Sequence, residues 1–170
     1  MYRERGFDQT TVTEIAARAG LTERTFFRYF TDKREVLFRG QDRLRELYMR
    51  AVASAPDSAT PIEAVAAALV AAAPMFHERR ERSQQRQAVI AANPELQERE
   101  LLKRASLAAA LADALRLRGV ADPDANLAAE VGVIAFHTAF ARWISDPGKQ
   151  DLARLIRESL DQLKAIIAGG

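Results

Sequence analysis

The sequence contains no cysteine, only two histidines and a single tryptophan. The absence of cysteine excludes a disulfide scaffold, thiolate metal sites and cysteine catalysis. His77 and His137 lie 60 residues apart, which is not the spacing of metal ligands. No phosphate-binding loop, nucleophile elbow or pair of catalytic carboxylates is visible. These absences argue against an enzyme, and we expect neither a cofactor nor a bound metal.

Long apolar segments are also missing. The longest weakly polar run, residues 64–76, is too short to span a bilayer and contains Pro74. The first five residues, MYRER, contain no apolar region of the kind found in a secretory signal. We therefore expect a soluble, cytoplasmic protein that does not enter a membrane.

The 170 residues have a globular balance, with 48% hydrophobic and 28% charged side chains. Residues 1–40 hold eight Lys and Arg against six Asp and Glu, which leaves 17 of each sign in residues 41–170. The whole excess of positive charge therefore lies in the first quarter of the chain. This excess is small, so it permits an anionic partner there but is equally compatible with an ordinary solvated surface.

The residue pattern predicts helices and no strands. Apolar residues recur at intervals of three and four, and proline, glycine and Asx residues separate the segments. Pro74 is expected to end or kink one helix near residue 73. The expected helices cover about residues 12–19, 23–29, 33–53, 61–73, 75–92, 94–118, 122–145 and 151–168.

The first two of these helices form a helix-turn-helix pattern around residues 20–22. Thr11 and Glu14 fit a capping box, in which each side chain bonds the other residue's backbone N–H. Thr22 can cap the second helix. Gly20 supplies the backbone freedom that the end of the first helix requires.

The second helix has an inner and an outer face. Phe26 and Phe30 are four residues apart and therefore share the inner face. The outer face displays Glu23, Arg24, Thr25, Phe27 and Arg28. Such a helix fits the major groove of DNA, where arginine can bond guanine and apolar groups can contact thymine methyls. Thr11, Tyr29 and Lys33 lie at helix starts or flanks, where they suit phosphate oxygens.

These segments resemble the DNA-binding half of the TetR family of bacterial repressors. The resemblance rests on residues 5–22, 25–30 and 33–37, which read RGFDQTTVTEIAARAGLT, TFFRYF and KREVL. It covers residues 2 to about 40, whereas residues 41–170 agree only in being a run of about six helices. The family implies an all-α homodimer whose recognition helices enter successive major grooves of a pseudopalindromic operator. It also implies a small ligand in the C-terminal domain that shifts the two DNA-binding heads apart and releases the DNA.

Carried over position by position, the resemblance implies two sets of DNA contacts. The groove-facing set is Thr13, Glu23, Arg24, Thr25 and Phe27, and the backbone-contacting set is Thr11, Tyr29 and Lys33. Phe27 stands where the family often has tyrosine, so it keeps an apolar contact and loses a phenolic one. Tyr29 stands where histidine is frequent and could replace a polar contact.

The family normally carries a full first helix, and this sequence opens near the last turn of that helix. Its loss is expected to expose Phe7, Ile15 and Phe30, because the first helix packs under the other two. Either the true start lies upstream, or the chain is truncated, or the protein binds DNA poorly. We expect this chain alone to bind DNA weakly, and a titration against an N-terminally extended version tests this; equal affinity would refute it.

The resemblance divides the chain into a DNA-binding domain, residues 1–40, and a helical ligand-binding and dimerisation domain, residues 41–170. The last two helices resemble the family's dimerisation pair. One carries the small residues Ala128, Gly132, Ala135 and Ala139, and the other the apolar residues Leu152, Leu155, Ile156, Leu163 and Ile167. Packing within one chain is the alternative use of both faces.

The candidate ligand-binding residues are Phe76, His77, Arg86, Ile90, Phe136, His137, Phe140 and Trp143. Aromatic residues at helical spacing form a core more often than a pocket. His137 could orient a ligand or serve as a core histidine, and Arg86 could meet a ligand anion or solvent. Only the resemblance indicates the kind of ligand, a small and mostly apolar molecule.

The sequence therefore predicts a ligand-responsive transcriptional regulator, a repressor that binds a palindromic operator as a homodimer. The alternative is a helical small-molecule-binding or interaction module with weak or lost DNA binding. A salt-dependent shift of palindromic promoter DNA distinguishes the two, since the affinity of a regulator falls steeply with salt. The residues do not decide between repression and activation.

Overall fold

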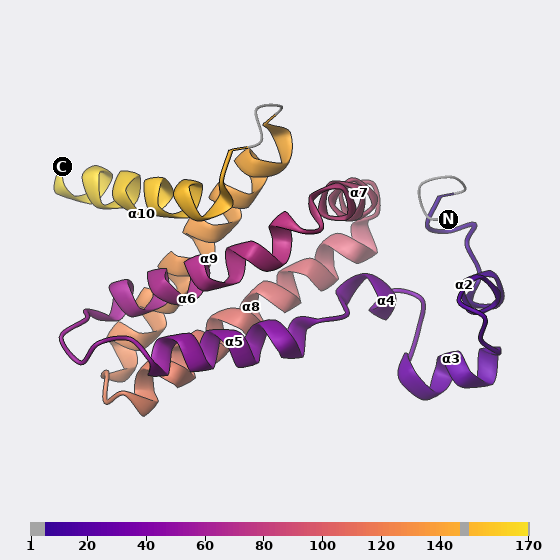
Figure 1. Cartoon of the computed structure of the whole chain (residues 1–170), viewed down its shortest axis with the longest axis horizontal. Coiled ribbons are helices and arrows are strands. Elements are labelled where there is room, and N and C mark those ends of the chain that lie inside the picture. The colour runs from indigo at the N-terminus through magenta and orange to yellow at the C-terminus, as the bar shows by residue number, and fades with distance from the viewer. Residues whose placement is uncertain (1–5, 147–149, 170) are drawn as a thin grey trace. The chain divides into compact units, whose positions relative to one another are not determined.

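The computed structural model describes residues 6–146 and 150–169, in which helices occur and strands do not (Figure 1). The prediction of an all-α fold is confirmed. The helices are α2 (Val12–Arg18), α3 (Glu23–Tyr29), α4 (Glu35–Phe38), α5 (Gln41–Ala53), α6 (Pro61–His77), α7 (Arg80–Ala91), α8 (Pro94–Leu117), α9 (Asp122–Ser145) and α10 (Leu152–Ala168). Two predictions lie outside the described residues. They are the last turn of the family's first helix, at residues 1–5, and the helix break at Pro147 and Gly148.

The chain forms two compact units. The head unit contains residues 6–41 and 81–101, and the body unit contains residues 42–80, 102–146 and 150–169. The helix-turn-helix segment therefore shares its unit with most of α7 and the first part of α8, two segments that are distant from it in the sequence. A domain boundary at residue 40 stays a prediction about function.

The capping signals of the head unit form as predicted. Thr11 accepts a hydrogen bond from the backbone N–H of Glu14 at 3.3 Å, and the Glu14 carboxylate accepts from the backbone N–H of Thr11 at 3.0 Å. Thr22 caps α3 by accepting from the backbone N–H of Thr25 at 3.2 Å. Gly20 has a φ of +69°, a left-handed backbone conformation that residues with a Cβ rarely adopt.

Two predicted helix boundaries are wrong. The single helix expected over residues 33–53 is divided into α4 and α5, because Gly40 between them has a φ of +98° that an α-helix cannot contain. Pro74 does not end its helix, since α6 continues to His77. The loss of one backbone N–H at Pro74 is offset by burial of the helix on the preceding turn, where Ala72 and Ala73 are at most 1% exposed.

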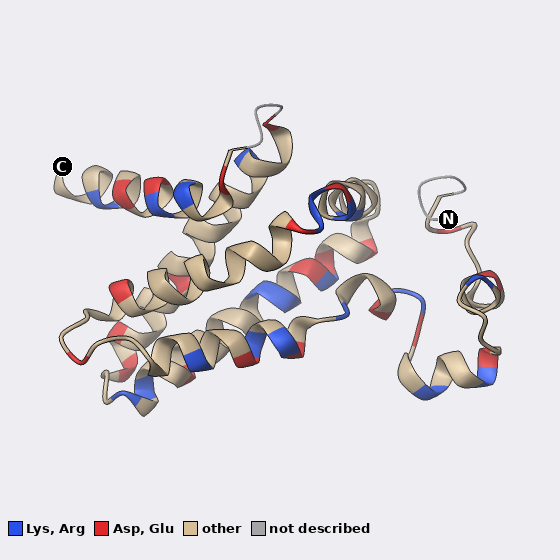
Figure 2. Cartoon of the chain, in the orientation of Figure 1, with Lys and Arg blue, Asp and Glu red and all other residues tan. Residues whose placement is uncertain are grey.

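The core of the body unit contains buried residues of α5, α6, α8, α9 and α10. Helices α6, α9 and α10 all pack on one another within it. The middle of α6 carries no charged residue (Figure 2). A Cβ on Gly132 of α9 would clash with the Val65 side chain of α6. The small-residue stripe predicted for dimer contact therefore serves packing within the chain, because only small side chains let two helices approach this closely. Ala128, Ala135 and Ala139 are likewise buried.

Helix α9 is long and apolar enough to cross a membrane by length and composition alone. One such helix is weak evidence, because the core helix of a soluble protein passes the same test. In the structure α9 packs against α6 and α10, which gives its apolar side a place in a protein core.

Candidate nucleic-acid interface

Helix α3 presents one face to the core and another to solvent. Phe26 is 1% exposed, and its ring lies 5.0 Å from the ring of Phe30 between centroids. Phe27 is 54% exposed and Tyr29 59%. Arg24 is also exposed, and Thr25 is half-buried. The predicted faces of α3 are therefore confirmed except at Thr25 and Phe30, which are half-buried. The contact of the outer face with DNA stays a prediction.

Side-chain hydrogen bonds fix part of this outer face. The Thr13 hydroxyl on α2 donates to Glu23 Oε1 on α3. The hydroxyls of Thr22 and Thr25 are 3.0 Å apart and hydrogen-bonded. The start of α3 has an acidic residue, Glu23, followed directly by a basic one, Arg24. Figure 2 shows red and blue side by side at this end of the helix. Three of the five predicted groove-facing residues are thus held by side-chain hydrogen bonds before any DNA is present.

Tyr29 has a partner that the sequence analysis did not assign. Arg28 Nη2 donates to the Tyr29 hydroxyl at 3.1 Å, and the guanidinium lies 4.8 Å from the centre of the tyrosine ring. Both side chains are exposed. The neighbouring positions gave no signal for this, because adjacent helical residues usually point apart. The pair presents a positive charge next to a phenol, a combination suited to a phosphate group.

Lys33, which was predicted to contact the DNA backbone, has a structural role in the head unit. Its ammonium group donates to the carbonyl oxygens of Phe7, Asp8 and Thr10 at 2.9, 3.1 and 3.2 Å. It also lies 4.5 Å from the centre of the Phe7 ring. An ammonium group has three donors, so a direct phosphate contact would require one of these bonds to break.

Phe7 is buried, at 4% exposure, and packs with Phe38, Ile90 and Leu96 in the core of the head unit. The expectation that it is exposed is therefore wrong for Phe7. The physical reason is that α7 and α8 supply apolar partners that are distant in the sequence. Ile15 and Phe30, for which the same exposure was expected, are half-buried.

The candidate ligand residues divide between the two units. Arg86 and Ile90 belong to the head unit, and Ile90 is part of its core. Arg86 donates to the Leu37 carbonyl oxygen at 2.6 Å and to Glu100 Oε2 at 2.6 Å. These contacts give Arg86 a structural role, which the sequence could not indicate because its partners lie on α4 and α8.

The remaining ligand candidates lie in the body unit. Phe76 lies 5.4 Å from Phe136 and 5.5 Å from Phe140 between ring centroids, and Phe140 lies 5.6 Å from Trp143. The three phenylalanines are half-buried, and Trp143 is fully buried. The structure thus gathers these aromatic residues from α6 and α9 into one cluster. His137, also on α9, is half-buried.

His77 adjoins the same cluster and the start of α10. Its ring centroid is 5.4 Å from that of Trp143. His77 Nε2 lies 2.9 Å from Asp151 Oδ1 and 3.1 Å from the backbone N of Leu152. Burial raises the pKa of Asp151, but hydrogen bonds from His77 and from backbone N–H groups outweigh it, and the pKa lies below its ordinary value. These contacts connect His77, at the end of α6, to the start of α10. His77 also remains a ligand candidate.

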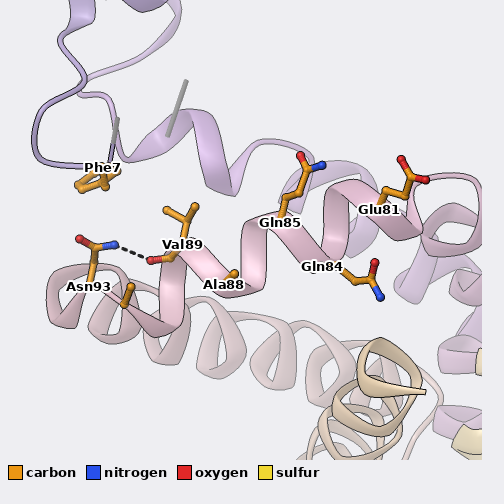
Figure 3. A pocket seen from close by; sticks show the side chains of 9 residues that line it. Phe7, Glu81, Gln84, Gln85, Ala88, Val89 and Asn93 are labelled. Atoms are coloured by element: carbon orange, nitrogen blue, oxygen red, sulfur yellow. Dashed lines mark hydrogen bonds between the residues drawn. The ribbon is translucent and has the colours of Figure 1, made fainter. Parts of the chain in front are cut away.

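The head unit contains a hollow of about 700 Å³ beside α7 (Figure 3). It is lined by Gly6, Phe7, Glu81, Gln84, Gln85, Ala88, Val89, Ala92 and Asn93. Asn93 donates to the Val89 carbonyl at its edge, at 2.6 Å. None of the predicted ligand residues lines this hollow or the smaller one beside Arg142 and Leu155. A ligand site among the aromatic residues therefore stays a prediction.

Two family models match the chain. The model described as bacterial regulatory proteins of the tetR family matches residues 1–39. The model of the MftR C-terminal domain matches residues 59–168, which is more than half of the chain. No curated protein matches the chain significantly.

The chain is similar to several solved structures, and the first one described below shows a similar fold. FadR from Thermus thermophilus, a TetR-family transcriptional repressor solved in complex with lauroyl-CoA, is 24% identical with a TM-score of 0.53, over 95% of this chain and 87% of that one. PfmR, a TetR-family transcriptional regulator also from Thermus thermophilus, is 21% identical with a TM-score of 0.49, over 95% and 91% of the two chains. A TetR/AcrR-family regulator from Thermobifida fusca is 20% identical with a TM-score of 0.45, over 95% and 89%.

The family models and the helix-turn-helix geometry agree. The model of the tetR family covers the segment that forms α2 and α3, and the MftR model covers α6 to α10. Proteins of this family are regulators and not enzymes. The chain therefore belongs to the TetR family of bacterial transcriptional regulators, and it is a DNA-binding regulator with a C-terminal domain of the MftR type.

Proposed function

We propose that this protein is a cytoplasmic repressor that binds a palindromic operator as a homodimer and is released by a small, mostly apolar molecule. Residues 1–40 bind DNA, and residues 41–170 bind the ligand and form the dimer. The observation that carries the proposal is the outward face of α3, where Arg24 and Phe27 are exposed while Phe26 is buried. The eight DNA-contacting residues predicted from the sequence remain the candidates.

A titration of promoter DNA by electrophoretic mobility shift tests the DNA-binding part of the proposal. The affinity of the wild-type protein for a palindrome should fall steeply as salt rises, because bound phosphates release counterions. Arg24→Ala should cost about 1–3 kcal/mol and relax base preference if the arginine makes a bidentate contact. Arg45→Ala, an exposed arginine on α5, removes the same charge and should have little effect. If Arg24→Ala left affinity and selectivity intact, α3 would not read the groove through this face.

The dimer is proposed from exposed apolar residues on the last two helices. Leu127 and Ile134 lie two turns apart on α9, where they are 66% and 56% exposed. Ile166 and Ile167 on α10 are 68% and 72% exposed. A palindromic site requires two heads about one helical turn of DNA apart, which two associated copies provide.

Sedimentation of the purified chain tests the dimer. The wild-type protein should sediment as a dimer, and Ile134→Glu should shift it to a monomer because a charge would be buried in the interface. Leu117→Glu is the control, since Leu117 is 81% exposed on α8. A monomeric wild-type protein, or equal effects of both changes, would contradict this interface.

The ligand is proposed to bind the aromatic cluster of Phe76, Phe136, Phe140 and Trp143. Lauroyl-CoA is a suitable first probe because most of its acyl chain is apolar, and it is the ligand named with FadR. It should raise the melting temperature and release bound DNA, whereas coenzyme A alone should do neither. Phe140→Ala should weaken both effects. Release by coenzyme A alone, or unchanged release from Phe140→Ala, would contradict an apolar site in this cluster.

A further inference from the structure

Thr13 and Glu23 join the two helices of the helix-turn-helix at its surface. Thr13 is on α2, Glu23 is the first residue of α3, and the Thr13 hydroxyl donates to Glu23 Oε1. Both residues are exposed. The helices beneath them pack through the buried Ala16 and Phe26, each 1% exposed. The bond therefore connects two parts of one rigid support.

The bond restricts the Glu23 side chain. A free glutamate loses rotamer freedom when its side chain is fixed, and this loss opposes binding. With one oxygen held by Thr13, part of that loss has occurred before DNA binds, and the carboxylate is aimed from the start of α3. Arg24, the next residue, is exposed.

A carboxylate on a DNA-reading surface can only accept hydrogen bonds. Of the four bases, cytosine presents a lone amino donor to the major groove, while guanine presents the acceptors N7 and O6 and thymine presents O4. Adenine presents its amino group beside the acceptor N7, which repels a second carboxylate oxygen. The carboxylate also repels the phosphates, so its contribution is to selectivity and not to affinity.

We propose that Glu23 is a specificity-determining residue that selects cytosine at one position of each operator half-site. In this inference, Thr13 is a positioning residue that acts through Glu23. The inference rests on the proposed function, because it requires α3 to lie in the major groove. It adds to that function the chemistry of one base position and the residue that prepares it.

Selection from a pool of randomised duplex DNA by the purified full chain tests the inference. The wild-type protein should enrich a motif with cytosine at one position of each half-site. Titrations with the four bases at that position should show roughly 5–100-fold preference for cytosine, the range of one direct base contact. Glu23→Gln should lose this preference and shift it to adenine, which glutamine bonds through N6 and N7.

Variants of Thr13 separate positioning from direct reading. Thr13→Val removes the hydroxyl at nearly constant volume and should reduce the cytosine preference about 3–10-fold without moving it to another base. Thr13→Ser should rescue the preference, since serine keeps the donor. Glu46→Gln, an exposed glutamate on α5, is the charge-matched control and should leave the preference unchanged. Equal melting temperatures exclude a loss of folding.

Four outcomes would overturn the inference. Cytosine preference that persists in Glu23→Gln assigns the reading to another residue. If Glu23→Gln gains the same affinity for DNA with every base at that position, Glu23 only repels the phosphates and selects no base. An unchanged profile in Thr13→Val removes its positioning role. If the wild-type protein enriches no motif at all, both the proposed function and this inference fail. If it enriches a motif whose base preference is relaxed by Arg24→Ala but not by Glu23→Gln, only this inference fails and the proposed function stands.

Discussion

Arg86 and Glu100 form a short ion pair in the head unit, with Arg86 Nη2 2.6 Å from Glu100 Oε2. The side chains are 23% and 9% exposed. Arg86 also bonds the Leu37 carbonyl oxygen, and its guanidinium lies 4.8 Å from the centre of the Phe38 ring. One arginine on α7 thus holds the end of α4 and the start of α8.

Replacing Arg86 by methionine should destabilise the protein by about 2 kcal/mol or more. The substitution keeps most of the apolar stem but removes the guanidinium from a carboxylate that is nearly buried, and that loss is costly. Urea unfolding measures the effect. Arg82→Met, an exposed arginine on the same helix, should change stability little. If both variants unfolded alike, the ion pair would not stabilise the head unit.

Lys33→Met should lower both stability and DNA affinity. Three carbonyl oxygens lose their donor, which we expect to cost about 2 kcal/mol. Lys33 supports the backbone before α2 and is proposed to contact no base, so affinity should fall alike for operator and random DNA. Thermal unfolding and parallel titrations measure the two effects. Lys164→Met, whose ion pair with Asp161 is exposed, is the control, and a loss restricted to operator DNA would argue against this role.

Gly132→Ala should destabilise the body unit by about 1–3 kcal/mol, even though alanine favours a helix. The added Cβ would clash with the Val65 side chain, and the contact lies between two packed helices that cannot easily separate. Chemical denaturation measures the change. Val65→Ala in the same chain should recover part of the loss by returning the space. A neutral effect of Gly132→Ala, or no recovery, would show that α6 and α9 do not meet closely here.

Acid unfolding should depend on Asp32. Burial raises its pKa, but hydrogen bonds from the Arg34 side chain and from backbone N–H groups outweigh this, so that the pKa lies below its ordinary value of 3.8. The folded pKa is therefore lower than the unfolded one. Asp32 contributes its full stabilisation above the unfolded pKa, and this contribution is lost as the pH falls through the folded pKa.

Asp32→Asn should therefore be less stable than the wild-type protein at neutral pH and should lose less stability below about pH 4. Unfolding by urea at a series of pH values measures both differences. Asp42→Asn, an exposed aspartate on α5, is the control. The same acid slope in the wild-type protein and in Asp32→Asn would contradict the pKa assignment.

Local signals predicted the helix-turn-helix well. Thr11 and Thr22 cap the two helices as expected, and Gly20 has the left-handed conformation that its position requires. These features depend on hydrogen bonds between residues at most a few positions apart, so a short stretch of sequence contains all the partners. The inner and outer faces of α3 follow from helix periodicity for the same reason.

Contacts between distant segments could not be predicted. Arg86 was a ligand candidate because its partners on α4 and α8 were not identifiable from the sequence. Phe7 was expected to be exposed because the first helix is largely missing, but Ile90 and Leu96 from α7 and α8 pack against it. Gly40 was a weaker signal than Gly20, since the apolar pattern continues across it. The continuation of α6 past Pro74 depends on burial, which no local pattern reports.

The sequence by itself determined that the chain is helical, where most helices begin and end, and which face of α3 points outward. Helix formation, capping and periodicity depend on interactions between residues that are close together in the sequence, so the sequence alone contains all the partners. The tertiary structure alone decided that Thr13 holds Glu23, that Lys33 binds three carbonyl oxygens and that the small residues of α9 pack against α6. Those relationships depend on how the helices pack, and packing brings together residues whose separation in the sequence contains no record of their distance in space.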